Sequence, residues 1–411
     1  MLKSNNKEFI FNLANRLFFL SIIAFSLFPL IPAKFKGAPV VILIGSSIFS
    51  IIHKKEKIKG FKYALLFSSV FIIYLISLFY SDNLGIGFRK IETTLSLLLV
   101  PFALESVYLG LRPKEEIKRK FLNLFIISTT LYSASIILYF AHLGFFSGEK
   151  SLSYCLSYLN GMYYLSEHPI YVSMLIAVTI IFIFNVFLKQ NYILRLLLLI
   201  GLVINIYVLF LLIRKGVIIA LLFSFVCYLF YKRTSPRKVN YKVIIIGVIL
   251  FLVVLFNLKS SIIKRFSELI LPETYEVVNE NNSTSIRYSI YKCSFSVINK
   301  KLLFGQGIGD TKDALIECYK GKAKILSKNK YNTHNQYLGV LLSIGFLGLV
   351  VFLLQLFFYL KKSLSENDTL FFQILIFFII LFFTENILER QTGVIFFSFL
   401  SNYFFYDNSN K

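Results

Sequence analysis

The chain has 411 residues, of which 57% are hydrophobic, and it carries a formal net charge of +23. This composition excludes a soluble domain and predicts an all-α, polytopic membrane protein built as a helical bundle. The basic residues gather between apolar runs rather than along one stripe of a soluble domain, so we expect no nucleic-acid partner.

Apolar runs long enough to approach or cross a bilayer of about 30 Å recur along the chain. They predict about twelve transmembrane helices, although several runs are shorter than the roughly 20 residues of an upright span. Basic residues precede the first run without a small-residue cleavage site after it, so we do not expect a cleaved signal peptide. The predicted runs are 17–32, 37–52, 61–80, 92–109, 121–143, 169–188, 192–212, 216–231, 242–257, 335–360, 370–384 and 387–406.

The distribution of Lys and Arg between the runs predicts the orientation of the chain. Loops on the cytoplasmic side of a membrane protein are enriched in basic residues. The loops at 53–62, 112–120 and 232–242 are rich in Lys and Arg, and the alternate connections are poor in them. We therefore expect both termini in the cytoplasm, with residues 1–257 forming about nine spans and residues 334–411 about three.

The segment 258–333 is the one long polar stretch, and this orientation places it outside the cytoplasm. It contains thirteen Lys or Arg and seven Asp or Glu residues, so it should attract anionic ligands at the membrane surface. Apolar residues at helical spacing from Ile286 to Val297 predict a partly helical loop or cap over the bundle. Cys293 and Cys318 share this segment and could form a disulfide in an oxidising compartment, which the sequence leaves open.

His334 is the strongest candidate for chemistry. It is one of four histidines, and it stands where the polar segment re-enters an apolar helix, in Tyr331-Asn-Thr-His-Asn-Gln-Tyr337. Histidine changes charge near neutral pH, and an ionisable group at a membrane usually has a functional reason. We expect His334 to act as a general base if suitable partners reach the same surface.

Two arginines are candidate phosphate ligands. Arg214 lies in a short external connection, where Gly216 is able to adopt the conformation that a tight turn needs. It either anchors a helix end or binds phosphate through its planar fork. Arg287 follows a cluster of good N-cap residues, 282–285, and is either a solvated surface residue or part of an anion site at the helix N-terminus.

The remaining motifs are weaker. The run Phe304-Gly-Gln-Gly-Ile-Gly309 matches a nucleotide-binding fingerprint only superficially, because no strand–helix unit surrounds it, and a tight turn is favoured. His168 opens a predicted span, where helix capping is favoured over catalysis. The Cys residues show no metal-ligand spacing and no acidic cluster is present, so neither a metal nor a cofactor is expected.

Taken together and in order, several segments resemble the O-antigen ligase and polymerase family of bacterial multi-span glycan transferases. The likeness covers about 205–400, and Leu212 and Ile213 stand where that family often has a serine-rich turn. The segments are Ile213-Arg-Lys-Gly216, Ser285-Ile-Arg287, Phe304-Gly-Gln-Gly-Ile-Gly309, Thr333-His-Asn-Gln-Tyr-Leu338 with Ser343-Ile-Gly-Phe-Leu-Gly348, and Thr384-Glu-Asn-Ile-Leu-Glu-Arg-Gln-Thr-Gly393.

The resemblance implies a glycan donor linked to undecaprenyl pyrophosphate and an acceptor hydroxyl, on the lipid A core or a growing glycan, at the periplasmic face of the bacterial inner membrane. Arg214 and Arg287 would then hold the pyrophosphate, and His334 would take the acceptor proton. The partners would be these two glycans and membrane lipid, without metal or cofactor. Supporting roles would fall to His168, Asn335, Gly305, Gly307 and Gly309.

Three functions remain open from the sequence. A ligase moves a finished glycan onto the lipid A core, whereas a polymerase joins repeat units on the lipid carrier. A membrane transporter is less favoured, because few ionisable residues lie near span centres and no inverted repeat is visible.

Overall fold

The computed structural model describes residues 2–54, 61–110, 115–162, 165–233, 267, 270–276, 278, 282–320 and 324–407. Helices connected by short turns make up this part of the chain, and it contains no strand. The prediction of an all-α protein is confirmed. The α-helices are α1 (Leu2–Ser26), α2 (Ala38–Lys54), α3 (Lys62–Ser77), α4 (Leu84–Thr94), α5 (Ser96–Gly110), α6 (Glu115–His142), α7 (Leu152–Tyr158), α8 (Pro169–Val186), α9 (Tyr192–Leu211), α10 (Lys215–Arg233), α13 (Ser283–Ile298), α14 (Thr311–Lys320), α15 (Lys324–Asn329), α16 (Gln336–Ser365), α17 (Thr369–Leu381) and α18 (Gln391–Asp407).

Among the described residues, eight helical stretches are long and apolar enough to cross a membrane, which confirms a polytopic membrane protein. Lys215–Tyr231 and Thr369–Leu381 are apolar but shorter. The predicted run 242–257 lies outside the described residues, so the count of twelve stays a prediction. The eight stretches are Glu8–Ser26, Ala33–His53, Lys62–Tyr80, Leu84–Tyr108, Glu115–His142, Pro169–Lys189, Tyr192–Leu211 and Gln336–Ser365.

Helix α8 packs against α6, α9, α10 and α17 and carries one part of the candidate site at its N-terminus. In its most apolar window 83% of the residues are buried, against 39% for the neighbouring α9. Apolar side chains in a membrane can meet either lipid or protein, so this burial shows that other helices cover most of α8, whereas α9 leaves more of its surface uncovered. Thus α8 provides a fixed support for the residue that precedes it, His168.

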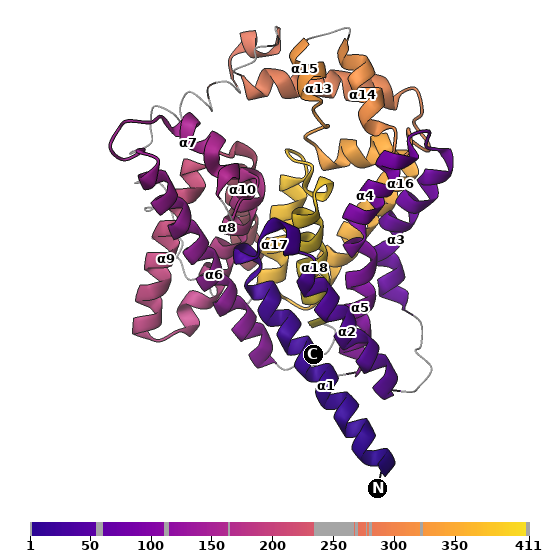
Figure 1. Ribbon diagram of the computed structural model, residues 1–411, viewed down its shortest axis with the longest axis vertical. Coiled ribbons are helices and arrows are strands. Elements are labelled where there is room, and N and C mark those ends of the chain that lie inside the picture. Colours follow the sequence, from indigo (N-terminus) through magenta and orange to yellow (C-terminus); the bar gives the residue numbers. More distant parts are fainter. Residues whose placement is uncertain are drawn as a thin grey trace.

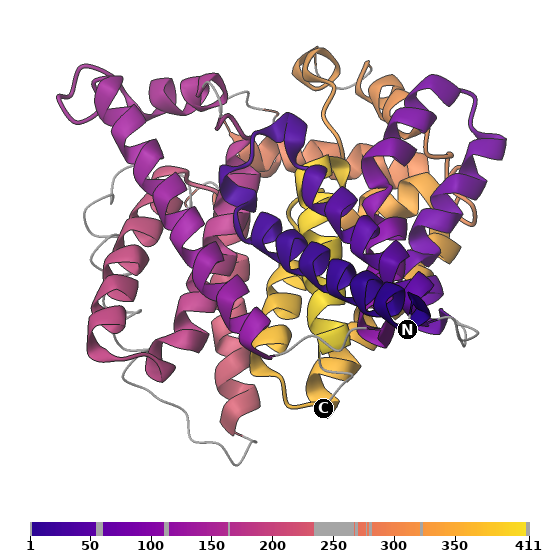
Figure 2. The same cartoon turned by 60° about the horizontal axis from the view of Figure 1, so that its bottom comes forward.

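Helices α13, α14 and α15 lie together at one end of the bundle, and both termini lie toward the opposite end (Figures 1 and 2). The predicted apolar stripe is confirmed, since Ile286, Ile290, Cys293 and Val297 are buried in a small second core. Leu338 and Leu342 of α16 belong to the same core and join this cap to the bundle. The structure also contains the disulfide that the sequence left open, between Cys293 and Cys318.

The glycine run at 304–309 forms a tight turn, as favoured from the sequence, and it packs on a break in α16. Gly305 and Gly307 have φ values of 73° and 95°, and a Cβ atom at Gly305 would come within 2.6 Å of the backbone of α16. The α16 helix is interrupted at Gly345, where φ is 69°. Backbone hydrogen bonds from 306–307 to the carbonyls of 342–343 satisfy groups that the interruption would leave open.

Candidate functional site

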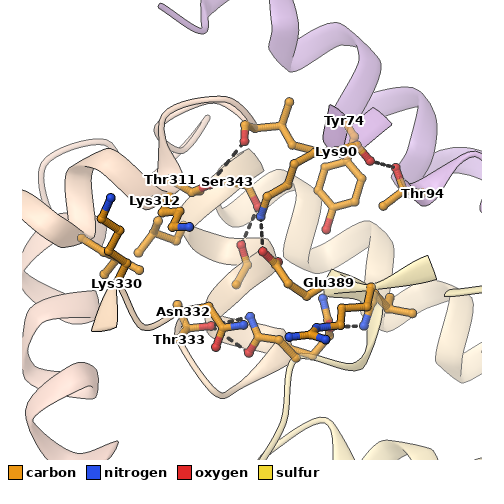
Figure 3. Close-up of a pocket in the computed structure, with 18 residues that line it drawn as sticks. Tyr74, Lys90, Thr94, Thr311, Lys312, Lys330, Asn332, Thr333, Ser343 and Glu389 are labelled. Atoms are coloured by element: carbon orange, nitrogen blue, oxygen red, sulfur yellow. Dashed lines mark hydrogen bonds and ion pairs between the residues drawn. The ribbon is translucent and has the colours of Figure 1, made fainter. Parts of the chain in front are cut away.

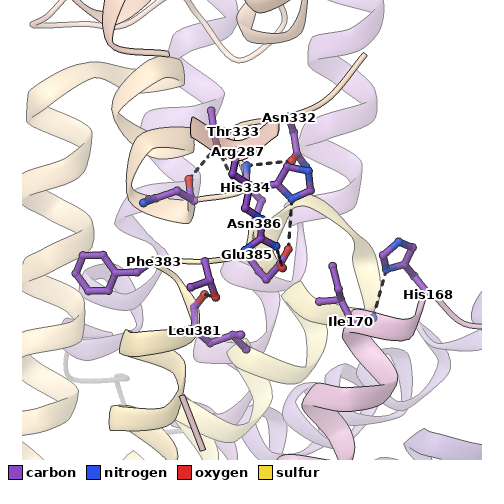
Figure 4. Close-up of polar contacts among 12 residues, drawn as sticks. His168, Ile170, Arg287, Asn332, Thr333, His334, Leu381, Phe383, Glu385 and Asn386 are labelled. Carbon is purple, nitrogen blue, oxygen red and sulfur yellow. Dashed lines mark hydrogen bonds and ion pairs between the residues drawn. The ribbon is translucent and has the colours of Figure 1, made fainter. Parts of the chain in front are cut away.

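Residues from four distant parts of the sequence meet under the cap. They come from the loop before α16, the start of α13, the connection between α17 and α18, and the N-terminus of α8 (Figure 4). The start of α10 approaches the same connection, because a Cβ atom at Gly216 would lie 2.2 Å from the hydroxyl oxygen of Thr384. Tertiary packing therefore gathers charged side chains that the sequence separates by up to 217 positions, from His168 to Glu385.

Glu385 lies at the centre of this cluster. One of its carboxylate oxygens accepts a short hydrogen bond from the guanidinium of Arg287, and the other lies 3.5 Å from His334 Nδ1. Glu385 itself is only 6% exposed. Burial alone would raise the pKa of Glu385, but the positive charge of Arg287 and the contact with His334 outweigh it, so the pKa lies below its usual range. The carboxylate is therefore ionised and holds both partners.

The backbone of His334 adopts a conformation that is uncommon for any residue but glycine. Its φ is 45°, and its N–H donates to the side-chain oxygen of Asn332 at 3.1 Å. The hydroxyl of Tyr291 donates to the His334 carbonyl at 3.3 Å. Left-handed backbone in such a residue is costly and is found disproportionately at functional sites. The ring thus presents Nδ1 to Glu385, which leaves Nε2 for a ligand.

A second left-handed residue directly precedes Arg214. Ile213 has a φ of 46°, whereas Gly216 lies within α10 and has an ordinary helical backbone. The turn therefore does not use the conformational freedom of Gly216. A glycine is required there instead for close packing against Thr384. Arg214 Nε is buried, and the positive charge of Arg214 acts on His168, so its side chain faces the cluster.

Arg287 is not a solvated surface residue, since its ion pair with Glu385 leaves its side chain 28% exposed. The predicted N-cap is present: Asn282 accepts hydrogen bonds from the backbone N–H groups of Thr284 and Ser285. These two donors are therefore occupied by the cap. The guanidinium, rather than the helix terminus, is the group here that can meet an anion.

His168 caps α8, as favoured from the sequence. Its Nδ1 accepts a hydrogen bond from the backbone N–H of Ile170 at 3.4 Å. Burial, and then the positive charges of Arg390 and Arg214, lower the pKa of His168 to about 4. The imidazole is neutral at neutral pH, and with Nδ1 accepting, its proton is on Nε2.

The region that contains these residues matches a known family. Residues 200–353 match the family model described as O-antigen ligase. This chain carries an O-antigen ligase domain. No curated protein matches the chain at a significant level. The family predicted from the sequence is confirmed, and with it an enzyme of the O-antigen ligase and polymerase type that transfers glycans.

The O-antigen ligase domain contains Arg214, Arg287 and His334, whereas His168 and Glu385 lie outside the matched residues. Sequence reasoning did not assign a role to Glu385. The available signal was a carboxylate at the end of an apolar run, inside the closing segment 384–393. That signal is weak, because Glu at a helix end has many structural explanations.

The supporting residues have structural roles that the contacts explain. The Asn335 side chain accepts a hydrogen bond from the backbone N–H of Leu338 at 3.0 Å and caps α16. Gly307 and Gly309 approach Ser81 and Asn83 closely, so the glycine turn connects α16 with the turn after α3. In the described part of the chain no group of three or more His, Cys, Asp or Glu is placed to hold a metal. The absence of a metal requirement stays a prediction.

Proposed function

We propose that this protein is a ligase that moves a glycan from undecaprenyl pyrophosphate to a hydroxyl of the lipid A core, at the periplasmic face of the bacterial inner membrane. The observation that carries the proposal is the convergence of His334 and Arg287 on the buried carboxylate of Glu385. The O-antigen ligase match over 200–353 supports the reaction class.

Each of these side chains has one step in the proposed reaction. His334 Nε2 takes the proton of the acceptor hydroxyl while that oxygen attacks the anomeric carbon of the donor sugar. The new glycosidic bond forms as the bond between the anomeric carbon and the pyrophosphate oxygen breaks. The electron pair leaves with undecaprenyl pyrophosphate, and direct attack from the opposite face inverts the anomeric configuration.

Glu385 positions the base in this proposal, and the arginines bind the leaving group. A carboxylate beside Nδ1 keeps the imidazole oriented and stabilises the imidazolium that forms when Nε2 gains a proton. A guanidinium has five N–H donors, so contact with Glu385 through Nη2 leaves Arg287 other donors for pyrophosphate oxygens. Arg214 adds positive charge where negative charge develops on the leaving group.

Two features support the periplasmic face. The cap carries the Cys293–Cys318 disulfide, and disulfides persist in oxidising compartments such as the periplasm. The cap and the site also lie at the end of the bundle away from both termini, which the distribution of basic loops places in the cytoplasm (Figure 1).

The test is to complement a deletion strain with His334→Asn and examine surface glycolipids and the lipid-carrier pool. Asparagine tolerates left-handed backbone, so the fold should be retained while the base is lost. We expect transfer to fall about 10²- to 10⁴-fold, the range of general-base contributions. Cores should then be bare, with long glycans accumulating on the carrier.

The matched control is His142→Asn, which changes an exposed histidine at the end of α6 and should transfer normally. Normal transfer by His334→Asn would refute the general-base role. Cores that carry a single repeat unit, with short units on the carrier, would identify a polymerase instead of a ligase.

A further inference from the structure

A cavity of about 340 Å³ lies beside the candidate site and is not used by the mechanism above (Figure 3). Its walls come from α3, α4, the start of α14, the loop 330–333, the start of α16 and the connection 386–390. None of His334, Arg214, Arg287 and Glu385 lines it. It is nevertheless adjacent, because Asn332, which lines the cavity, accepts the backbone N–H of His334.

The cavity has an excess of positive charge. Lys90, Lys312, Lys330 and Arg390 line it, and Glu389 is the one carboxylate among its described lining residues. Glu389 is paired with Lys90 at 2.5 Å, so that pair is close to neutral. The remaining three cations have no carboxylate in the lining to balance them. The N-terminus of α14, at Thr311, adds positive partial charge to the same wall.

The polar part of the lining around Thr333 and Asn386 is held by its own hydrogen bonds. Thr333 and Asn386 bond to each other at 2.8 Å, and Gln336 accepts the backbone N–H of Leu388 at 2.8 Å. These bonds connect the loop of His334 to the connection that contains Glu385. A ligand on this wall would therefore rest on the same backbone that positions the base.

One rim residue is held in a strained position. Lys330 follows α15 with a φ of 50°, and its N–H donates to the carbonyl of Leu326 at 3.1 Å. Glycine is the usual residue at this left-handed position after a helix. A lysine there costs conformational energy, and such strain is found disproportionately at ligand sites.

We propose that this cavity binds an anionic sugar residue, one with a carboxylate or a phosphate group, from a substrate glycan. This inference rests on the proposed function. The volume of the cavity lies at the lower end of the range for ligand pockets, which is about 300–1,000 Å³. Hydroxyl and amide side chains in the lining can hydrogen-bond to sugar hydroxyls, and Tyr74 supplies an aromatic ring. The three cations without a carboxylate in the lining can bind the acidic group.

Direct binding tests the proposal without turnover. The full chain in nanodiscs would be titrated with methyl glucuronide, glucose 6-phosphate and neutral methyl glucoside, and binding followed by saturation-transfer NMR. We expect an acidic sugar to bind and the neutral one to bind at least about 10-fold more weakly, with binding that weakens as salt is raised. Whichever acidic probe binds more tightly identifies carboxylate or phosphate as the natural group.

The double variant Lys312→Gln, Lys330→Gln should bind the acidic probe about 10-fold more weakly, because two exposed charges each contribute modestly. The matched control is Lys320→Gln, which removes an exposed charge from α14 outside the cavity. Equal binding of all three sugars, or unchanged acidic binding by the double variant, would overturn the proposal. His334→Asn should bind the probe normally, so loss of turnover there with binding intact separates this site from the mechanism.

Discussion

Two buried carboxylates near the N-terminus of α8, those of Glu167 and Glu385, differ in how exposed their cationic partners are. Glu167 pairs with Lys36 at 2.6 Å, and the two side chains are 8% and 2% exposed. Glu385 is buried to the same degree, but its partners Arg287 and His334 are 28% and 24% exposed. Both members of the Glu167–Lys36 pair are shielded from solvent, whereas the partners of Glu385 can be reached by a ligand.

The difference separates a structural ion pair from a site. Glu167 is occupied on every side: it also accepts hydrogen bonds from Thr392 and from the backbone N–H of His168. Its bonds join the α2 region, α8 and α18, and both members of the pair are buried. Glu385 holds two groups that can each make a further bond at the surface. Burial of a carboxylate alone is therefore a poor indicator of chemistry.

The comparison predicts opposite phenotypes for matched substitutions. Glu167→Gln leaves Lys36 as an uncompensated buried charge and should cost about 3–5 kcal/mol of stability. Glu385→Gln leaves partners that water can reach, so stability should change little while transfer falls about 10²-fold through the misplaced base. Thermal unfolding in detergent and transfer by the same preparations measure both. The comparison fails if Glu385→Gln unfolds the protein or if Glu167→Gln is as stable as the parent.

Arg287→Lys tests whether the ion pair of Arg287 with Glu385 also binds the donor. Lysine keeps the charge but loses the planar fork, so it cannot bind Glu385 and a pyrophosphate oxygen together. A charge-assisted hydrogen bond is worth about 1.5–3 kcal/mol, so transfer should fall about 10- to 100-fold, mainly through weaker donor binding. Arg89→Lys, an exposed arginine on α4, is the control. Donor titrations that agree for Arg287→Lys and the parent would show that Arg287 is only structural.

The smallest expected effect concerns His168, on which both carboxylates act electrostatically. The pKa of His168 is lowered to about 4 in the fold, whereas an unfolded histidine titrates near 6.5. Between these values the unfolded chain binds more protons, so stability should decrease as pH falls from about 6.5 to 4. His168→Asn keeps a helix-capping side chain and should flatten this part of the pH profile of the unfolding temperature. An unchanged slope would show that other groups control it.

The sequence predicted the candidate residues better than their partners. His334 was identified from its place at a loop–helix junction. Arg214 was identified from its charge in a short connection, and Arg287 from the N-cap residues that precede it. Glu385 could not be assigned, because 51 residues separate it from His334 and no local pattern connects them. Gly216 offered the usual left-handed residue for the turn beside Arg214, but in the structure Ile213 takes that conformation and Gly216 packs within α10 against Thr384.

The sequence by itself determined the class of the protein, because hydropathy and basic loops act locally on each segment as it meets the membrane. It also determined the helical cap, since the stripe from Ile286 to Val297 has one periodicity whatever covers it. Only the tertiary structure decided which charges meet. The packing of α13 over the connection after α17 brings Arg287 and Glu385 together across 98 residues, and no local propensity encodes that contact.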